Sequence, residues 1–158
     1  MYVRGVETPS FLEGYLPYVL RRADQALSSA FYGVLNDYGV ARSEWRVLAV
    51  LEELGELSIL ELTAASLSPQ PTVTQAVRRL EERNLVTRTQ GTQDKRQRFV
   101  SVTATGSKLT RTLIGEAKAL EADFLADAGD LDRLFATLAS LTDHIEARAR
   151  AAEIEKAQ

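Results

Sequence analysis

The sequence has no cysteine and a single histidine, His144. Without a thiol the chain can form no disulfide and perform no thiolate chemistry, and one imidazole rules out a histidine-based metal cluster within one chain. The glycine-rich dinucleotide fingerprint, the phosphate-loop Gly-Lys-Ser/Thr and the nucleophile elbow are also missing. We therefore expect no catalytic residue, no bound metal and no cofactor, and an enzyme is the weakest functional class.

The chain also lacks the run of roughly 18 apolar residues that marks a membrane span, and its first residues lack the apolar segment of an export signal. We therefore expect a cytoplasmic protein with no membrane partner. Of its 158 residues, 45% are hydrophobic and 26% are charged, which is typical of a soluble chain with a real core. This length predicts one domain over 1–158.

Residues 68–83 have the pattern of an amphipathic helix. Ser68 can cap it, and the prolines that follow are tolerated in a first turn, where amides make no intrahelical bond. Apolar residues recur at spacings of four and three and can fix one face to a core: Val73, Val77 and Leu80. Asn84 tolerates a left-handed backbone and can end the helix.

A basic hairpin follows this helix, because residues 85–90 and 98–102 are rich in β-branched residues and flank a polar tip. Between residues 78 and 98 there are seven basic and three acidic residues, so this segment is +4 in a protein of net charge −3. Positive charge gathered in one segment is typical of a surface that binds duplex DNA. An ordinary solvated helix face is the alternative, which the hairpin disfavours.

The helices that precede this segment complete a DNA-binding lobe. Ser43 can cap a helix that ends at Gly55, and Ser58 with Glu61 forms a capping box that opens a short helix, 59–67. Two short helices and a hairpin predict a mainly α fold with a small β-hairpin, a winged helix-turn-helix lobe over 43–102. Its recognition helix is expected at 69–83 and its wing at 85–102.

Long helices with narrow apolar seams are expected outside this lobe: 16–38, one capped by Thr103 and ended by Gly129, and one capped by Asp130. Such a seam needs a partner helix. One copy of the chain could fold these helices into a small bundle. A symmetric dimer through about 11–38 and 105–150 would bury the same seams and present two recognition helices to half-sites about 10 base pairs apart. A charged residue at Leu113 or Leu138, which lie on these seams, should break such a dimer.

At this point the sequence resembles the multiple-antibiotic-resistance regulator (MarR) family of bacterial transcription factors, from about Leu16 to Ile145. The segments that carry the resemblance are Ser43-Glu-Trp-Arg-Val-Leu, Thr72-Val-Thr-Gln-Ala-Val-Arg-Arg-Leu-Glu-Glu-Arg-Asn-Leu-Val, Asp94-Lys-Arg and Val100-Ser-Val-Thr-Ala-Thr-Gly. The resemblance implies a homodimer with interlocking outer helices and a recognition helix in each of two major grooves. It also implies that Arg96 enters the flanking minor groove and that Arg79 pairs with Asp94 to hold the wing.

Three residues depart from the family pattern: Arg78 where an acidic residue is common, Gln75 where a basic one is common, and Asn84 where glycine is usual. These differences affect the operator sequence more than the fold. The residues expected to contact DNA are Ser68, Gln70, Pro71, Thr72, Thr74, Gln75, Arg78, Arg79, Asp94, Lys95, Arg96 and Arg98.

The lack of cysteine and the single histidine also limit how DNA binding could be controlled. Oxidant sensing through cysteine is excluded, and one histidine disfavours metal sensing, which leaves a small organic, aromatic or anionic effector. The resemblance suggests a site where the first, second and fifth helices meet the DNA-binding lobe. The expected walls are Tyr18, Arg22, Trp45 and Arg46, because aromatic faces with a guanidinium suit an aromatic carboxylate. A core position for Trp45 and a solvent-facing one for Arg22 are the alternatives.

The leading hypothesis is therefore a homodimeric repressor that binds a pseudo-palindromic double-stranded operator and is released by a small organic ligand. The alternative is a winged-helix architectural or partner-binding protein without ligand control.

Overall fold

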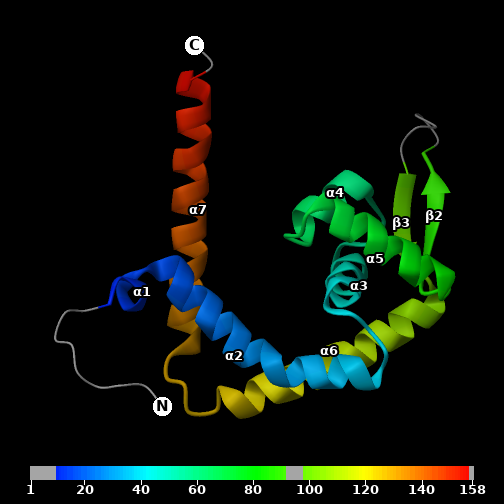
Figure 1. Ribbon diagram of the computed structural model, residues 1–158, viewed down its shortest axis with the longest axis horizontal. Helices are drawn as coiled ribbons and strands as arrows, with labels where there is room; N and C mark the ends of the chain where they lie inside the picture. Colours follow the sequence, from blue (N-terminus) through cyan, green and yellow to red (C-terminus); the bar gives the residue numbers. More distant parts are fainter. Residues whose placement is uncertain (1–9, 92–97, 157–158) are drawn as a thin grey trace. The chain divides into compact units, whose positions relative to one another are not determined.

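The computed structural model describes residues 10–91 and 98–156 (Figure 1). The chain divides into two compact units, residues 1–121 and 122–158. The elements in chain order are α1 (Phe11–Gly14), α2 (Leu16–Asp37), α3 (Arg42–Leu54), β1 (Leu57–Ser58), α4 (Ile59–Ala65), α5 (Gln70–Glu82), β2 (Val86–Gln90), β3 (Arg98–Val102), α6 (Ala104–Phe124) and α7 (Leu131–Lys156). The expected fold class, mainly helical with a small β-structure and a winged helix-turn-helix, is confirmed. None of the described helices combines the length and apolar character of a membrane span.

The sheet of the first unit has three antiparallel strands in the order β1-β3-β2. Strands β2 and β3 form the expected hairpin, with Val86 opposite Val102 and Gln90 opposite Arg98. Strand β1 pairs with the other side of β3, Leu57 opposite Val100. The sequence did not predict β1, because two residues are too few to show a strand period and only their pairing with β3 makes them a strand.

Three of the expected helix caps are confirmed. Ser58 and Glu61 form the reciprocal box, with hydrogen bonds of 2.8 and 3.3 Å, and open α4. Thr103 Oγ1 and Asp130 Oδ1 each accept, at 3.0 Å, the backbone N–H three residues farther on. Asn84 has the expected left-handed backbone, with φ 56°, just after α5 ends.

The two expected serine caps are wrong. Helix α3 begins at Arg42, before Ser43, and the Glu44 carboxylate accepts the Ala41 N–H at 3.0 Å. Helix α5 begins after Pro69, and the Ser68 hydroxyl instead donates to the Ser66 carbonyl at 3.0 Å, in the turn after α4. Each serine sits near the right helix end, but a competing local hydrogen bond decides the boundary.

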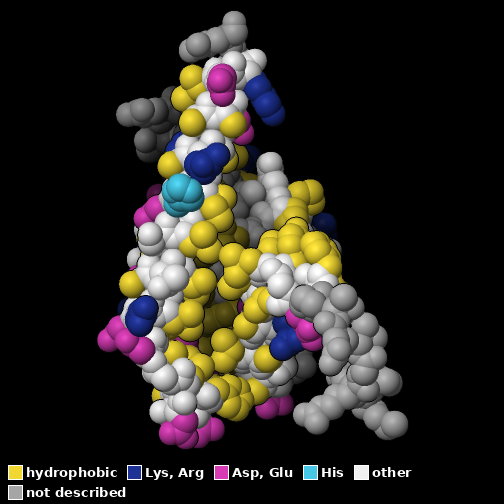
Figure 2. All heavy atoms as spheres, turned by 90° about the vertical axis from the view of Figure 1, so that its left-hand side faces the viewer, with side chains coloured by type: hydrophobic (Ala, Val, Ile, Leu, Met, Phe, Trp, Pro, Cys, Tyr) yellow, Lys and Arg dark blue, Asp and Glu magenta, His cyan; other side chains and the backbone are white. Residues whose placement is uncertain are grey.

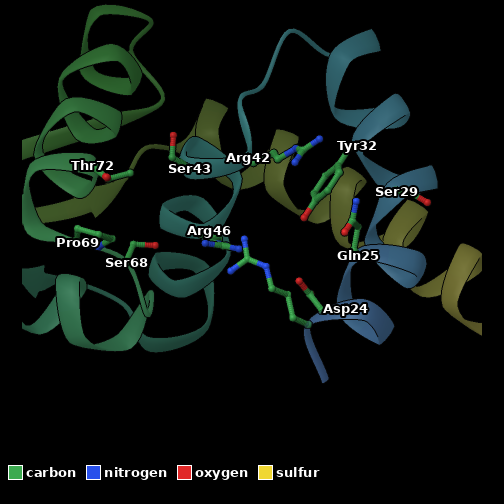
Figure 3. Close-up of a pocket in the computed structure, with 11 residues that line it drawn as sticks. Asp24, Gln25, Ser29, Tyr32, Arg42, Ser43, Arg46, Ser68, Pro69 and Thr72 are labelled. Atoms are coloured by element: carbon green, nitrogen blue, oxygen red, sulfur yellow. The ribbon is translucent and has the colours of Figure 1, made fainter. Parts of the chain in front are cut away.

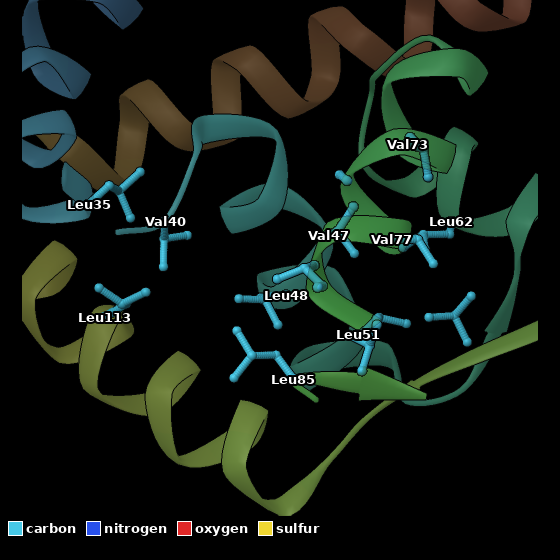
Figure 4. Close-up of a cluster of buried hydrophobic side chains, with 14 of the residues drawn as sticks. Leu35, Val40, Val47, Leu48, Leu51, Leu62, Val73, Val77, Leu85 and Leu113 are labelled. Atoms are coloured by element: carbon cyan, nitrogen blue, oxygen red, sulfur yellow. The ribbon is translucent and has the colours of Figure 1, made fainter. Parts of the chain in front are cut away.

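The core of the first unit lies where α3, α4, α5 and the sheet meet, and it continues to α2 and α6 (Figure 4). Leu113 of α6 is fully buried in this cluster, together with Leu35 and Val40. The sequence placed Leu113 on a dimer seam. This is a correction, because an apolar stripe on a helix shows that something covers it but not what does so.

Gly106, in the first turn of α6, is required where this helix starts against the wing. A Cβ on it would collide with the Leu85 carbonyl oxygen and lie 2.8 Å from Val102 Cγ2. Thr103 bridges the same place, because its hydroxyl donates to the Asn84 carbonyl at 2.8 Å. The close approach therefore fixes α6 to the end of α5.

The second unit is dominated by α7, a 26-residue helix without a buried residue. Several of its apolar side chains are open to solvent in the single chain, with Leu134, Phe135 and Ile145 at 50, 55 and 54% exposure, while Leu131, Leu138 and Leu141 are half-buried. Figure 2 shows hydrophobic side chains, in yellow, along the helix that carries the cyan histidine.

Candidate nucleic-acid interface

Helix α5 has one apolar face, and that face is buried. Val73, Ala76, Val77 and Leu80 are at most 1% exposed and pack into the core. The remaining faces are open to solvent and carry Gln70, Pro71, Thr72, Thr74, Gln75, Arg78 and Arg79. The orientation expected from the sequence is therefore confirmed, while contact of these residues with DNA stays a prediction.

The exposed side chains of α5 divide into two groups. Gln70, Pro71, Thr74, Gln75 and Arg78 line one open groove of about 500 Å³ along the helix. Thr72, Ser68 and Pro69 instead line a larger pocket on the other side of the helix start.

Arg78 is held on the helix surface by Glu82. Its Nε lies 3.0 Å from the Glu82 carboxylate one turn farther on, and both side chains are well exposed. An exposed pair of this kind contributes little stability. Arg78 can therefore exchange Glu82 for another partner at low cost.

The C-terminal end of α5 is fastened by a contact that the sequence did not reveal. Arg83 Nη1 donates to the Gly39 carbonyl at 2.8 Å and to Glu44 at 3.2 Å. Glu44 is only 5% exposed, and its carboxylate also accepts the Ala41 amide. One carboxylate therefore joins the start of α3 to the end of α5.

A second ion pair joins α5 to the wing. Arg88 of β2 donates to Glu81 Oε2 from Nε at 2.9 Å and also from Nη2. The hydrogen bond from Arg88 lowers the pKa of Glu81, to which the charges of Arg88 and Arg98 add, and the same bond raises the pKa of Arg88. The pair is thus charged throughout the neutral range.

Of the wing residues that the sequence predicts to contact DNA, the structure describes Arg98 alone. Arg98 begins β3 and is exposed. Asp94, Lys95 and Arg96 lie outside the described residues, so the Arg79–Asp94 pair and the minor-groove position of Arg96 stay predictions.

A polar pocket of about 870 Å³ lies between α2, the start of α3 and the start of α5 (Figure 3). Its basic residues are Arg21, Arg42 and Arg46, and Asp24 is its acidic one. The Arg42 guanidinium lies over the Tyr32 ring, 3.5 Å from the ring centroid, a cation–π arrangement.

Of the four residues expected to bind an effector, Arg46 alone lines this pocket. Arg22 is exposed, and Tyr18 is half-buried one turn earlier on α2. Trp45 packs edge-on against Phe31, with ring centroids 5.0 Å apart, which is the core position given as its alternative. Trp45 and Arg46 do share a smaller hollow of about 320 Å³ beside the turn before α5.

The pocket residues missed in the sequence are Arg21, Tyr32 and Arg42. Arg21, Gln25 and Tyr32 recur along α2 at spacings of four and seven, so they share one face. This polar stripe could have been read from the sequence, but the helix that it faces could not.

The profile of the MarR family matches residues 40–97, which include α3 to β2. A MarR-family transcriptional regulator from Silicibacter pomeroyi, SPO1453, is 32% identical, with 84% of this chain and 98% of that chain covered and a TM-score of 0.72. This chain belongs to the MarR family. The chain is accordingly a transcription regulator with a DNA-binding winged helix, while the roles of α5 as recognition helix and of β2 and β3 as wing stay predictions.

Two other similar proteins bear on control. The structure of NadR in complex with 4-hydroxyphenylacetate is 25% identical, covers 92% of this chain and 97% of that one, and has a TM-score of 0.72. The homoprotocatechuate degradative operon repressor of Escherichia coli is 28% identical over 71% of this chain and 78% of its own length. The second of these proteins is named as the repressor of an operon.

Proposed function

We propose that this MarR-family regulator is a homodimeric repressor that binds a pseudo-palindromic operator and leaves it when a small organic anion binds. The observation that carries the proposal is α5, whose apolar face is buried while Thr74, Gln75 and Arg78 are exposed. A polar helix face on a rigid support is what major-groove reading requires.

The exposed residues of the lobe would have different roles in DNA binding. Arg pairs bidentately with guanine and Gln with adenine, so Arg78 and Gln75 would read bases. Arg96 would enter a narrow minor groove and favour A·T-rich flanks, while Lys95 and Arg98 would touch phosphates.

Dimerisation is supported by the apolar side chains that one copy leaves exposed. On α7 these include Leu134, Phe135 and Ile145, and at the N-terminal end Phe11 is 74% exposed. A monomer rarely leaves such stripes open, and a second copy would cover them.

The effector is proposed to bind the polar pocket. Three guanidinium groups can neutralise a carboxylate, and Tyr32 offers an aromatic face. NadR, a similar structure, holds 4-hydroxyphenylacetate, an aromatic carboxylate. Such a ligand would release DNA only to the extent that it prefers a dimer whose recognition helices do not fit the two half-sites.

Selection of bound fragments from genomic DNA would test the DNA function. We expect one palindromic motif, and Arg78→Ala and Gln75→Ala should each lose about 1–3 kcal/mol of base discrimination. Arg150→Ala, on α7, is the matched control. If no motif emerges, the architectural or partner-binding alternative replaces the regulator.

Titration of the protein–DNA complex would test the effector. We expect 4-hydroxyphenylacetate or a related aromatic carboxylate to release DNA, with Arg21→Ala weakening this response. Arg22→Ala removes the neighbouring, exposed guanidinium outside the pocket and should not. Release by peroxide or zinc, with no response to organic ligands, would overturn the proposed control.

A further inference from the structure

The base of the wing consists of β2, from Val86 to Gln90, and β3, from Arg98 to Val102. It carries an ion pair whose two residues are not among those proposed to contact DNA. Arg88 stands opposite Val100 in the hairpin, and Val100 is fully buried. Residues opposite each other in antiparallel strands point to the same face. Arg88 therefore leaves the sheet on the core side, just beyond the apolar packing.

On that side Arg88 meets Glu81, in the last turn of α5. The guanidinium donates to one carboxylate oxygen from both Nε, at 2.9 Å, and Nη2. The pair joins residues seven apart in sequence, across the chain reversal from α5 to β2. It therefore fixes one element relative to the other, unlike the Arg78–Glu82 pair, which lies within one helix.

The other face of β2 is held as well. Thr89 points away from Arg88, because successive residues of a strand alternate, and its hydroxyl lies 3.3 Å from Glu56 Oε2, just before β1. Two carboxylates thus fasten adjacent residues of β2 from opposite sides.

We infer that Glu81 is a positioning residue for DNA binding: it holds Arg88 so that the recognition helix and the wing meet the duplex as one rigid unit. The two elements are proposed to enter different grooves, and an orientation fixed in advance lowers the ordering cost of binding. The inference rests on the proposed DNA contacts of α5 and the wing.

A competing account gives Arg88 a direct role. If Arg88 bound a DNA phosphate, and Glu81 merely paired with Arg88 in the free protein, removing the Glu81 charge would strengthen DNA binding. It would also steepen the salt dependence by about 0.9 per phosphate gained. Positioning predicts the opposite sign.

The test uses the full chain and a duplex that the wild-type protein selects from a random library, made with A·T-rich or G·C-rich flanks. We expect Glu81→Gln to weaken binding roughly tenfold and to reduce the preference between flanks, with an unchanged salt slope. Arg88→Gln should do the same, and the two losses should not add, because both remove one contact.

Two further variants separate positioning from general damage. The charge reversal, Glu81→Arg with Arg88→Glu, should recover most of the affinity and the flank preference. Glu53→Gln removes an equal charge from an exposed residue of α3 in the same lobe and should bind as the wild type does.

Tighter binding with a steeper salt slope, additive losses, or a charge reversal that restores nothing would each overturn the positioning role alone. A wild-type protein that selects no duplex would overturn the proposed DNA contacts and this inference with them.

Discussion

The winged-helix lobe and helix α7 use similar residues in different ways. Ion pairs of the lobe connect separate elements: Glu44 of α3 pairs with Arg83 just after α5, and Glu52 of α3 pairs with Arg111 of α6, outside the lobe. Another pair, Arg78–Glu82, lies within α5. In α7 the pair Arg150–Glu146 lies within one helix. The lobe buries Leu48, Leu51, Leu62 and Leu80 almost completely, whereas α7 has no buried residue. The lobe therefore has a buried core and ion pairs between its elements, while the exposed apolar side chains of α7 are those proposed to meet a second copy.

The largest effect should come from Gly106, where α6 lies close against Leu85 and Val102 of the lobe. Gly106→Ala would drive a methyl group into the Leu85 carbonyl, and backbone cannot move aside cheaply. We expect a loss of about 3 kcal/mol in the free energy of unfolding, measured by urea denaturation.

Gly115→Ala is the matched control in the same helix, because a Cβ there meets nothing within 4 Å in the single chain. It should raise the stability by about 0.5–1 kcal/mol through helix propensity. Equal losses in both variants would show that α6 is not held by its contact with the wing.

The next effect concerns α7. Leu134→Glu should weaken the dimer by about 2 kcal/mol, roughly 30-fold in the dissociation constant, because a charge would enter the proposed interface. Sedimentation equilibrium measures it. Ala136→Glu places the same charge on the opposite side of α7 and should change little. A monomeric wild type at micromolar concentration would refute the dimer.

Leu113 is not a suitable position for this test, although the sequence suggested it. A charge there would enter the core of the first unit and unfold it, since Leu113 is 0% exposed. Seam spacing could not distinguish Leu113, which packs inside its own chain, from Leu134, which does not.

A fall in pH should destabilise the lobe, by less than the substitutions above. The hydrogen bond from Arg111 lowers the pKa of Glu52, with a second bond from Ser107. A carboxyl group whose folded pKa is depressed adds stability above its unfolded pKa, roughly 4.3, and this is lost as the pH falls through the folded value.

We therefore expect the melting temperature of the lobe to fall as the pH drops from about 5 to 3, with a shallower fall for Glu52→Gln. Glu53→Gln is the neighbouring charge control. Parallel curves for the wild type and Glu52→Gln would show that the pair with Arg111 does not couple folding to protons.

The smallest effect is a gain. Leu67, in the turn before α5, has φ 50° and is 89% exposed, so it has left-handed strain without burial. Leu67→Asn should raise the free energy of unfolding by about 0.5–1 kcal/mol, because Asn tolerates this backbone. Leu60→Asn, at an exposed helical position, should give no such gain.

Local signals explain what the sequence predicted well. The Ser58–Glu61 box, the Thr103 and Asp130 caps and the left-handed Asn84 depend on residues no more than a few positions apart. The apolar face of α5 follows from helix geometry alone.

Contacts between distant residues explain what it missed. Glu44 meets Arg83 across 39 positions and Glu52 meets Arg111 across 59, and no periodicity encodes such partners. The lining of the polar pocket differs from the predicted effector residues for the same reason, because Arg21 and Arg46 line one pocket only when α2 and α3 are placed.

Thr72 has a consequence for how such a regulator changes over generations. It lines the polar pocket and also belongs to the leading turn of α5, whose exposed residues are proposed to meet DNA. A mutation that adapts this residue to a new ligand alters the surface offered to the operator at the same time. Under the proposed roles of the pocket and of α5, a descendant adapted to a different signal would also present a changed surface to its target sites, so the two specificities would change together.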